Sequence, residues 1–352
     1  MTHNVASHIR PRSGQESPVT ENRQMMIASL PDGQLRTADF ELRSGAVPEP
    51  TDGQVLCRTL ALTIGAGQRA GLQGSAGYAG APEANRVMSA TGVARVEGST
   101  DPAFAVGDLV VGATGWQDYS VHRPTSLTKV AAGTDPAHQL GVLGTNGLTA
   151  YFGLIDVGAP RPGDTVVVSA AAGSVGHVAG QIAKVLGARV VGVAGSDEKC
   201  RLLRDELGFD VAVNYRGNDF RAELKTATPD RIDVYFDNTG GDVLGSALFR
   251  MSVGGRIVCC GVVSQYDTSH PDPGPRGVPG LLINNRVKMQ GFLVFDFADR
   301  YEEARRQLSE WIGSGALKPR VTDYAGLEQA PQAFVDLLAG RTIGTTIVRV
   351  AD

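Results

Sequence analysis

The chain has 352 residues, more than one domain usually holds, and 42% of them are hydrophobic, enough for two cores. Its net charge of −4 excludes the strongly basic surface that nucleic-acid binding requires. No run of about 18 apolar residues occurs, so we predict no membrane-spanning helix.

The chain opens with a polar segment, residues 1–22, that lacks the apolar core of a signal peptide. We interpret it as a flexible tail and expect the protein to be cytoplasmic. Only six of the 33 basic residues are lysine. Such an arginine bias is typical of a GC-rich bacterial coding sequence.

Short strands broken by Gly and Pro follow the tail, which predicts a β-rich domain. The predicted strands cover residues 54–62, 92–97, 108–112 and 118–121. After a helical segment at 330–339, residues 345–350 again look like a strand, and we expect this last piece to join the same domain.

Residues 65–80 contain six glycines, at positions 65, 67, 71, 74, 77 and 80. This composition predicts a mobile lid over a binding site, with a slack surface loop as the alternative.

The most informative stretch runs from Thr165 to Gly180. A β-branched strand at 165–169 is followed by Ala-Ala-Gly-Ser-Val-Gly at 171–176, and a helical pattern starts near Val175. We expect Gly173 to let the backbone approach a pyrophosphate and Gly176 to let the helix lie close to the strand. The alternative is an ordinary tight turn between strand and helix.

Five more strands are predicted after this turn, separated by segments of helical length such as 197–207 and 220–227. They cover residues 189–194, 211–215, 232–238, 256–260 and 288–294. Six strand and helix units with a glycine fingerprint at the first turn predict a doubly wound Rossmann domain.

The end of the second strand indicates which dinucleotide binds. NAD-binding domains place an acidic residue there, whereas this chain reads Ala194-Gly195-Ser196 followed by Lys199 and Arg201. The missing acid and the positive charges favour NADP. Asp197 and Glu198 are then interpreted as charges at a helix N-terminus, and a solvated surface role for Lys199 stays possible.

No metal site is predicted. The four cysteines are scattered or, at 259–260, lie within an apolar strand, and the six histidines lack metal-ligand spacing. His177 falls in the first turn of the fingerprint helix, where we expect a plain surface role.

From about residue 22 to the end, the chain resembles the zinc-independent branch of the medium-chain dehydrogenase/reductase superfamily, which includes prostaglandin reductases, 2-alkenal reductases and curcumin reductases. The zinc signature of the alcohol dehydrogenases is absent. The matching motifs are Pro48-Glu49-Pro50, Gly115-Trp116-Gln117-Asp118-Tyr119, Leu148-Thr149-Ala150-Tyr151, the fingerprint, Gly195-Ser196-Asp197-Glu198-Lys199, Asn214-Tyr215, Asp237-Asn238, Ser264-Gln265-Tyr266 and Gln290-Gly291-Phe292.

The resemblance implies an α/β fold with a Rossmann domain at residues 144–321 and a β-rich GroES-like substrate domain at 23–143 and 322–352. It also implies a homodimer with the contact near residues 288–294, NADPH as cofactor, and a small conjugated carbonyl compound as substrate; neither nucleic acid nor a membrane is expected as a partner. The implied reaction is hydride transfer to the β-carbon of an α,β-unsaturated ketone or aldehyde.

Site residues are carried over by position. Lys199 and Tyr215 match positions that hold the NADP 2′-phosphate, Asn238 lies beside the nicotinamide ribose, and Gly261 and Phe292 line the nicotinamide. The full set of expected cofactor contacts is Asn146, Ala172, Gly173, Ser174, Val175, Gly176, Gly195, Ser196, Lys199, Tyr215, Asn238, Gly261, Ser264, Tyr266, Phe292, Val294 and Thr342.

The catalytic prediction is Tyr266, which matches the family tyrosine that binds the substrate carbonyl. An enolate formed without a metal needs positioned hydrogen-bond donors, here Tyr266 and a cofactor ribose hydroxyl. Tyr266 or water would deliver the proton to the α-carbon. The alternative for Tyr266 is core packing.

Three departures from the family pattern stand out. Gly67 replaces the tyrosine of the family's Asp-Pro-Tyr-Met-Arg segment, which opens volume for a bulkier substrate. Asn146 stands where relatives carry proline, and its amide is free to contact substrate or cofactor. At 342 and 345, threonines replace the common Asn and Lys.

Two alternatives remain. One is a tailoring enzyme of specialised metabolism, which uses the same NADPH site on a large polyketide-like or terpenoid intermediate; reduction coupled to cyclisation is one version of this alternative. The other is a non-enzymatic dinucleotide-binding protein, which the presence of Lys199, Tyr215 and Tyr266 disfavours.

Overall fold

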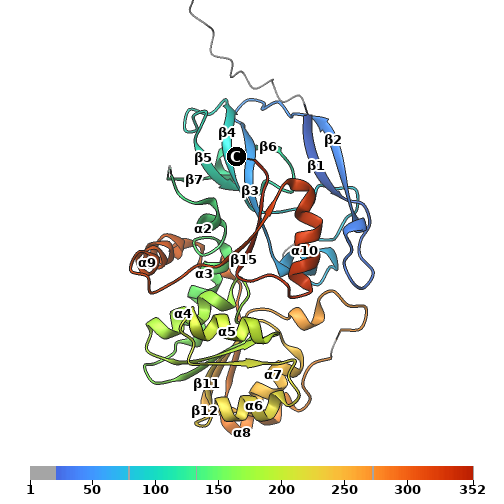
Figure 1. The fold of residues 1–352 in the computed structure, drawn as a ribbon. Helices are drawn as coiled ribbons and strands as arrows, with labels where there is room; N and C mark the ends of the chain where they lie inside the picture. The colour runs from blue at the N-terminus through green and yellow to red at the C-terminus, as the bar shows by residue number, and fades with distance from the viewer. Residues whose placement is uncertain (1–20, 78–79, 132, 272, 352) are drawn as a thin grey trace, which may run out of the picture.

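Two β-sheets, one above the other in Figure 1, organise the chain. The computed structural model describes residues 21–77, 80–131, 133–271 and 273–351. Most of the predicted tail therefore lies outside the described residues. Its last two residues were assigned wrongly, because β1 (Glu21–Ile27) starts there and the Asn22 side chain is buried, donating to the Tyr119 carbonyl at 3.1 Å.

The lower sheet has six parallel strands in the order β10-β9-β8-β11-β12-β13. This is the strand order of a Rossmann domain, and the predicted doubly wound sheet is confirmed. The strands are β8 (Thr165–Val168), β9 (Arg189–Ala194), β10 (Val211–Asn214), β11 (Ile232–Asp237), β12 (Met251–Cys259) and β13 (Lys288–Gly291). The sixth strand ends earlier than predicted, because Val294 begins a 3₁₀ segment, Val294–Arg300.

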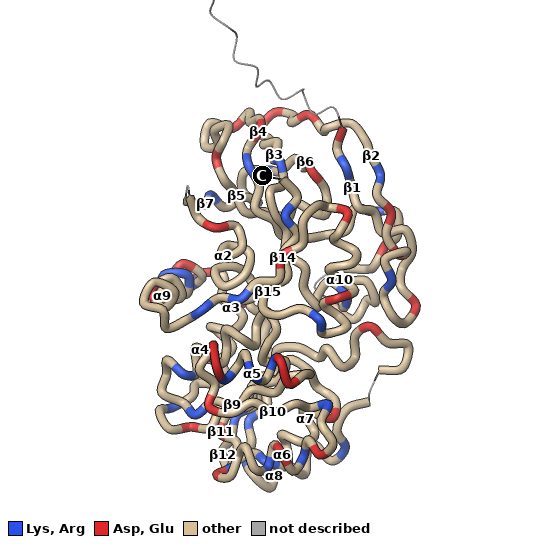
Figure 2. The backbone as a smooth tube through the Cα atoms, in the orientation of Figure 1, with Lys and Arg blue, Asp and Glu red and all other residues tan. Residues whose placement is uncertain are grey.

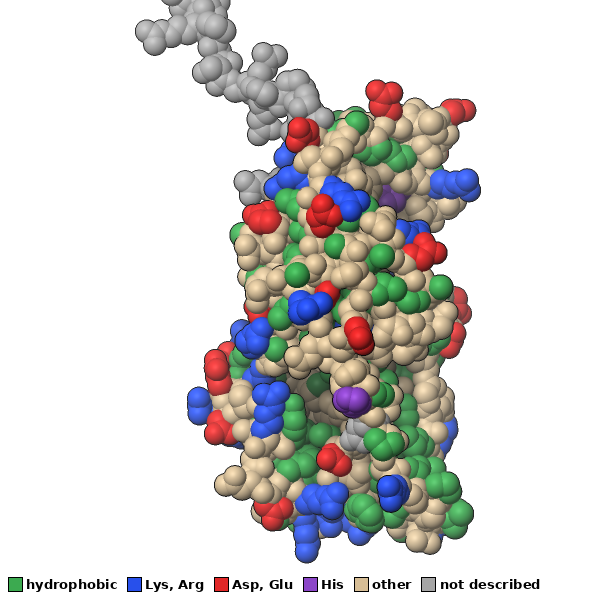
Figure 3. Space-filling model, turned by 90° about the vertical axis from the view of Figure 1, so that its right-hand side faces the viewer, with side chains coloured by type: hydrophobic (Ala, Val, Ile, Leu, Met, Phe, Trp, Pro, Cys, Tyr) green, Lys and Arg blue, Asp and Glu red, His purple; other side chains and the backbone are tan. Residues whose placement is uncertain are grey.

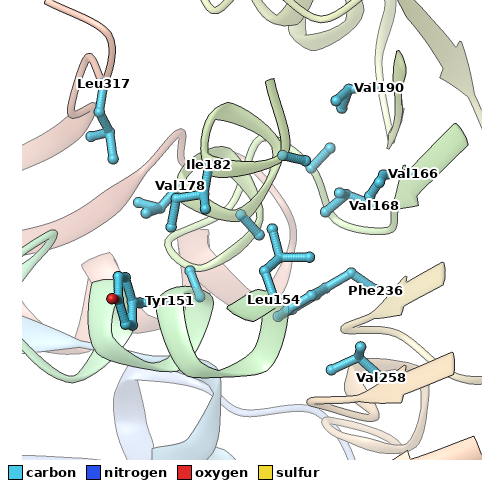
Figure 4. Close-up of a cluster of buried hydrophobic side chains, with 14 of the residues drawn as sticks. Tyr151, Leu154, Val166, Val168, Val178, Ile182, Val190, Phe236, Val258 and Leu317 are labelled. Atoms are coloured by element: carbon cyan, nitrogen blue, oxygen red, sulfur yellow. The ribbon is translucent and has the colours of Figure 1, made fainter. Parts of the chain in front are cut away.

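Helices cover both faces of this sheet, since side chains on a strand alternate between its faces. Val166 and Val168 of β8 point into the cluster of Figure 4, with Val178 and Ile182, whereas Val167 faces the opposite cluster. The first face carries α3 (Thr145–Phe152), α4 (Gly176–Val185), α5 (Asp197–Asp205) and α9 (Tyr301–Gly313), and the second carries α6 (Phe220–Ala227), α7 (Gly241–Leu248) and α8 (Val278–Asn285).

The upper sheet has seven strands in the order β14-β15-β3-β4-β5-β7, with β6 also paired to β3. As predicted, the C-terminal segment joins it, because β15 pairs antiparallel with β3. The strands are β3 (Val55–Ile64), β4 (Gly92–Ser99), β5 (Leu109–Gly112), β6 (Tyr119–His122), β7 (Thr128–Val130), β14 (Val321–Ala325) and β15 (Thr345–Arg349). The short helix α2 (Pro136–Leu140) packs near β3 and β15.

A separate antiparallel pair, β1 with β2 (Phe40–Ala46), flanks this sheet and was not predicted. Its inner side is held by aromatic packing: the Trp116 ring lies 5.1 Å from Phe40 and 6.0 Å from Phe334 of α10 (Ala330–Leu338), measured between ring centroids. Charged residues of both signs are spread over both halves in Figure 2.

The predicted lid at residues 65–80 begins with a helix, α1 (Ala66–Leu72), so the expectation of a loop there was wrong. The Gln68 side chain accepts a hydrogen bond from the Gly65 N–H at 2.8 Å, and Ala70 and Leu72 are buried. Burial of these two side chains anchors the segment despite its glycines.

His177 joins the two halves of the molecule, and the expected surface role was wrong. Its side chain is 1% exposed, with Nδ1 at 2.8 Å from the Gly173 carbonyl. Nε2 accepts a hydrogen bond from the Arg320 N–H at 3.2 Å, in the segment that leads to β14. Burial lowers the pKa of His177 to about 4, so the ring is neutral at physiological pH.

This burial predicts a pH-dependent stability. Between pH about 6.5 and 4 the unfolded chain protonates His177 while the folded chain does not, so stability is lost as pH falls, by about 3 kcal/mol at most. We expect urea titrations to show that the free energy of unfolding falls less between pH 7 and pH 5 for His177→Gln than for the wild type. An equal drop in both proteins would contradict the prediction.

Candidate functional site

The fingerprint turn has the geometry that its glycines predict. Gly173 N–H donates to the Ala170 carbonyl at 2.9 Å, and α4 begins at Gly176. A Cβ at Gly176 would lie 2.8 Å from the Ala171 Cα, so only glycine fits where the helix meets the strand. No side chain caps α4 at Val175, which leaves its first N–H groups oriented for an anion.

The segment that precedes β15 covers the fingerprint. Gly344 N–H donates to the Ala172 carbonyl at 2.8 Å, and the Ser174 hydroxyl donates to the Gly344 carbonyl at 3.0 Å. Thr342, in the same segment, is buried. The expected contacts from Ala172, Ser174 and Thr342 to a cofactor therefore lie along a joint between the two halves.

Four residues gather at the carboxyl end of the second strand of the lower sheet. A Cβ built on Gly195 would lie 3.1 Å from the Tyr215 ring and 3.5 Å from Arg216 Nε. Arg216 Nε donates to the Tyr215 hydroxyl at 3.2 Å, and Lys199 Nζ donates to the Gly340 carbonyl at 2.7 Å. We call Gly195, Lys199, Tyr215 and Arg216 the cationic cluster.

Charge in this cluster favours an anion. Burial lowers the pKa of Lys199, and the positive charge of Arg216 lowers it further. The carboxylate of Asp197 is already bonded to the Asn214 amide at 2.8 Å, in the first turn of α5 as predicted. Sequence reasoning missed Arg216, although its position directly after Tyr215 at the end of the third strand was a usable signal.

Buried polar groups join β8 to β11 beside the fingerprint. Asn238 Nδ2 donates to the Ser169 carbonyl at 2.7 Å, so its amide fixes the two strand ends to each other. The Asp237 carboxylate accepts from Ser169 Oγ at 3.2 Å and Tyr235 OH at 3.0 Å. Burial raises the pKa of Asp237. The hydrogen bonds of Asn238 and Asp237 therefore fix the ends of β8 and β11 beside the fingerprint.

A cavity of about 660 Å³ lies beyond the carboxyl ends of β12 and β13, where ligands of open α/β sheets bind. The face shown in Figure 3 is hollowed between the upper and lower halves. Four residues singled out from the sequence line the cavity: Gly67, Asn146, Phe292 and Val294. It is also lined by Gly65, Gly71, Met88, Thr145, Thr149, Cys260 and Phe295.

Cys260 is the thiol that faces this cavity, and it is not a nucleophile at neutral pH. Burial raises its pKa to about 12, which keeps the sulfur protonated. Across the part of the chain that the structure describes, no group of three or more His, Cys, Asp or Glu residues could hold a metal ion.

Tyr266 lies outside the lining of this cavity, as do Gly261, Ser264 and Thr342. It follows the 3₁₀ turn η5 (Val263–Gln265), and its N–H donates to the Val263 carbonyl at 3.1 Å. Its half-buried side chain is not part of a core cluster. The structure therefore gives no support to the core-packing alternative, and the catalytic role of Tyr266 stays a prediction.

Comparison with known proteins finds matches for both halves of the chain. Residues 23–130 match the family model described as the N-terminal domain of oxidoreductase, and residues 174–310 match the zinc-binding dehydrogenase model. A putative NADP-dependent oxidoreductase of Bacillus subtilis is 41% identical over 94% of this chain and 98% of its own length. The NADPH-dependent curcumin reductase of Escherichia coli is 39% identical over 94% of this chain and 97% of its own.

Similar relations hold for solved structures. The crystal structure of CurA from Vibrio vulnificus in complex with NADPH superimposes with a TM-score of 0.90 at 37% identity, covering 94% of this chain and 99% of that one.

Proposed function

Because this chain belongs to the zinc-independent branch of the medium-chain dehydrogenase/reductase superfamily, we propose that it reduces the carbon–carbon double bond of an α,β-unsaturated ketone or aldehyde with NADPH. The observation that carries the proposal is the pairing of the cationic cluster with the cavity at the carboxyl edge of one sheet. The cluster matches a 2′-phosphate, and the cavity has room for a nicotinamide and a conjugated carbonyl.

In this proposal the fingerprint residues 172–176 bind the pyrophosphate through backbone N–H groups. Gly195, Ser196, Lys199, Tyr215 and Arg216 hold the adenosine ribose and its phosphate. Asn238, Gly261, Phe292 and Val294 border the nicotinamide, with Asn146, Ser264 and Thr342 as further contacts. Bound NADPH supplies the hydride that reaches the β-carbon of the substrate.

This chain's own residues then have to stabilise the oxygen on which negative charge develops. Tyr266 is the proposed donor to that oxygen, and the Asn146 amide, which lines the cavity from α3, is positioned to orient the carbonyl. A phenol that donates to an enolate is also a source of the proton for the α-carbon.

The direct test follows NADPH absorbance with purified protein and a panel of small enals, enones and one bulky conjugated diketone, with NADH as control. We expect NADPH oxidation with at least one conjugated carbonyl and a reduced product saturated at that bond. Tight NADPH binding with reduction of isolated ketones only would contradict the proposal.

A second candidate, a tailoring enzyme with a large substrate, is favoured by Gly67. This residue lines the cavity and is exposed to it without a side chain. The space that a tyrosine fills in the family is therefore open for a bulky polyketide-like or terpenoid substrate.

Restoring a tyrosine at this position tests the size preference. We expect Gly67→Tyr to lower kcat/KM for the bulky diketone by about tenfold and to leave it unchanged or raised for a small enal. Gly77→Tyr is the control, because Gly77 lies outside the cavity lining and a Cβ built on it would meet nothing within 4 Å. Equal losses on both substrates would contradict a role in size selection.

We also propose a homodimer in the bacterial cytoplasm. β13 is the last strand of the lower sheet, so its outer edge is open to a second copy. Nearby, Ile283 of α8 and Val253 of β12 are 73% and 63% exposed. We expect light scattering to give a dimer mass for the wild type and a monomer for Ile283→Arg; a monomeric wild type would refute the proposal. No helix in the described ranges is long and apolar enough to cross a membrane.

A further inference from the structure

Helix α1 and the residue that follows it hydrogen-bond to the two neighbours of Tyr266 in the sequence. Arg69 Nε donates to Asp267 Oδ1 at 3.2 Å, and Gln73 Nε2 donates to the Gln265 carbonyl at 3.3 Å. Gln73 directly follows the last residue of α1 and lies about one helical turn after Arg69. Their acceptors are the residues immediately before and after Tyr266.

The buried Arg69 side chain and the half-buried Asp267 side chain connect three segments that are far apart in the sequence. The Arg69 side chain is 2% exposed, and its Nη2 donates to the Gly33 carbonyl at 2.6 Å. Asp267 Oδ1 also accepts from the Leu35 N–H at 2.5 Å. Asp267 adopts a φ of +58°, a conformation that costs a non-glycine residue energy and that these bonds hold in place.

Apolar packing does not fix this segment. Residues 261–270, all of which the structure describes, include no buried side chain. Instead they border a second cavity of about 420 Å³, which Arg69, Gln73, Gln265 and Thr268 line together. Hydrogen bonds therefore contribute to the position of Tyr266, and the charge-assisted bond from Arg69 is one of them.

Arg69 itself is costly to bury. Its Nη1 is enclosed and has no hydrogen-bond partner among the described residues. A methionine of similar length would fill the same space without that cost, so stability alone does not account for an arginine here.

We propose that Arg69 is a positioning residue for Tyr266, which it holds at the active site through Asp267, with Gln73 as the second tether. The proposal rests on the role proposed above for Tyr266. Because α1 supplies Gly67 and Gly71 to the lining of the larger cavity, and its N-cap Gly65 lines it too, one helix both shapes that cavity and holds the segment of the proposed donor.

A double-mutant cycle tests this. Arg69→Met, Tyr266→Phe and the double variant are assayed for kcat and KM with the best enone, and NADPH affinity is measured by fluorescence titration. We expect Arg69→Met to lower kcat by about 10- to 100-fold with NADPH affinity within about twofold of wild type. In the Tyr266→Phe background the same substitution should lower kcat by less than about threefold.

Two outcomes would overturn the proposal separately. Full activity of Tyr266→Phe would remove the role of Tyr266 and the positioning role with it. Loss in Tyr266→Phe with an undiminished further loss on adding Arg69→Met would leave the proposed function intact and refute the positioning role alone.

Two further variants guard against a folding defect. Gln73→Ala removes the second tether without touching the buried charge, and we expect a several-fold loss of kcat that also disappears in the Tyr266→Phe background. Arg43→Met, which breaks an exposed pair with Glu41 on β2, is the matched control and should change neither kcat nor NADPH affinity. An additive loss from Gln73→Ala would count against the proposal even if Arg69→Met failed to fold.

Discussion

Replacing Lys199 and Arg216 together by methionine is expected to lower kcat/KM with NADPH by about 100- to 1000-fold and to leave kcat/KM with NADH nearly unchanged. In the proposed function each cation donates a charge-assisted hydrogen bond to the 2′-phosphate, which NADH lacks, and each such bond is worth about 1.5–3 kcal/mol. Arg216 already contacts Tyr215, so its guanidinium needs little reorganisation to close on the phosphate.

The assay compares initial rates with the two cofactors at subsaturating concentration. Lys184→Met is the matched control. Lys184 lies in the last turn of α4, where it pairs with Asp210, and it is outside the cationic cluster. A parallel fall of the NADH rate would show that the substitutions disturb the fold rather than phosphate recognition. Since the Arg216 guanidinium also lies 5.5 Å from the Tyr215 ring centroid, the single variant Tyr215→Leu should show part of the same effect.

Asp237→Ala is expected to destabilise the folded chain by about 4 kcal/mol. One carboxylate oxygen accepts hydrogen bonds from the Thr239 and Gly240 N–H groups and from the Ser169 and Tyr235 hydroxyls, all next to the fingerprint. Removing it leaves several buried donors without an acceptor at the joint between β8 and β11.

Asp237→Asn separates hydrogen bonding from charge. The amide oxygen keeps the acceptor, and burial already disfavours the ionised acid, as the raised pKa of Asp237 indicates. We therefore expect a loss of about 1 kcal/mol or less for this variant in urea titrations. Equal destabilisation by Ala and Asn would show that the negative charge, rather than the acceptor, stabilises this region.

Much of the lower half could be predicted because buried parallel strands are marked in the sequence. Apolar runs such as 166–168 and 190–194 have no polar alternation, and a glycine that lies against backbone, such as Gly176, cannot be replaced. The strands β1 and β2 gave no such signal, since nearly every residue of β2 is exposed. Helix α1 was not predicted, because its two glycines have low helix propensity.

The site was predictable where it depends on consecutive residues and less so where distant segments meet. Gly195, Lys199 and Tyr215 came from local motifs, and the structure brings them together. His177 is bonded to Arg320, and Asp267 is bonded to Arg69. Because each pair is far apart in the sequence, no local pattern predicts either contact. Whether Tyr266 reaches the substrate depends on such long-range contacts.

The position of β15 in the upper sheet also determines the order in which the two sheets can be completed during synthesis. β3 at residues 55–64 is made before the parallel sheet, yet the edge on which β15 pairs must wait until residues 345–349 have been made. Meanwhile the entire parallel sheet is synthesised between them, and it is free to fold first. The segment that closes the upper sheet also bonds to the fingerprint through Gly344. The upper sheet is therefore completed, and the fingerprint turn bonded to it, only after all six strands of the parallel sheet have been made.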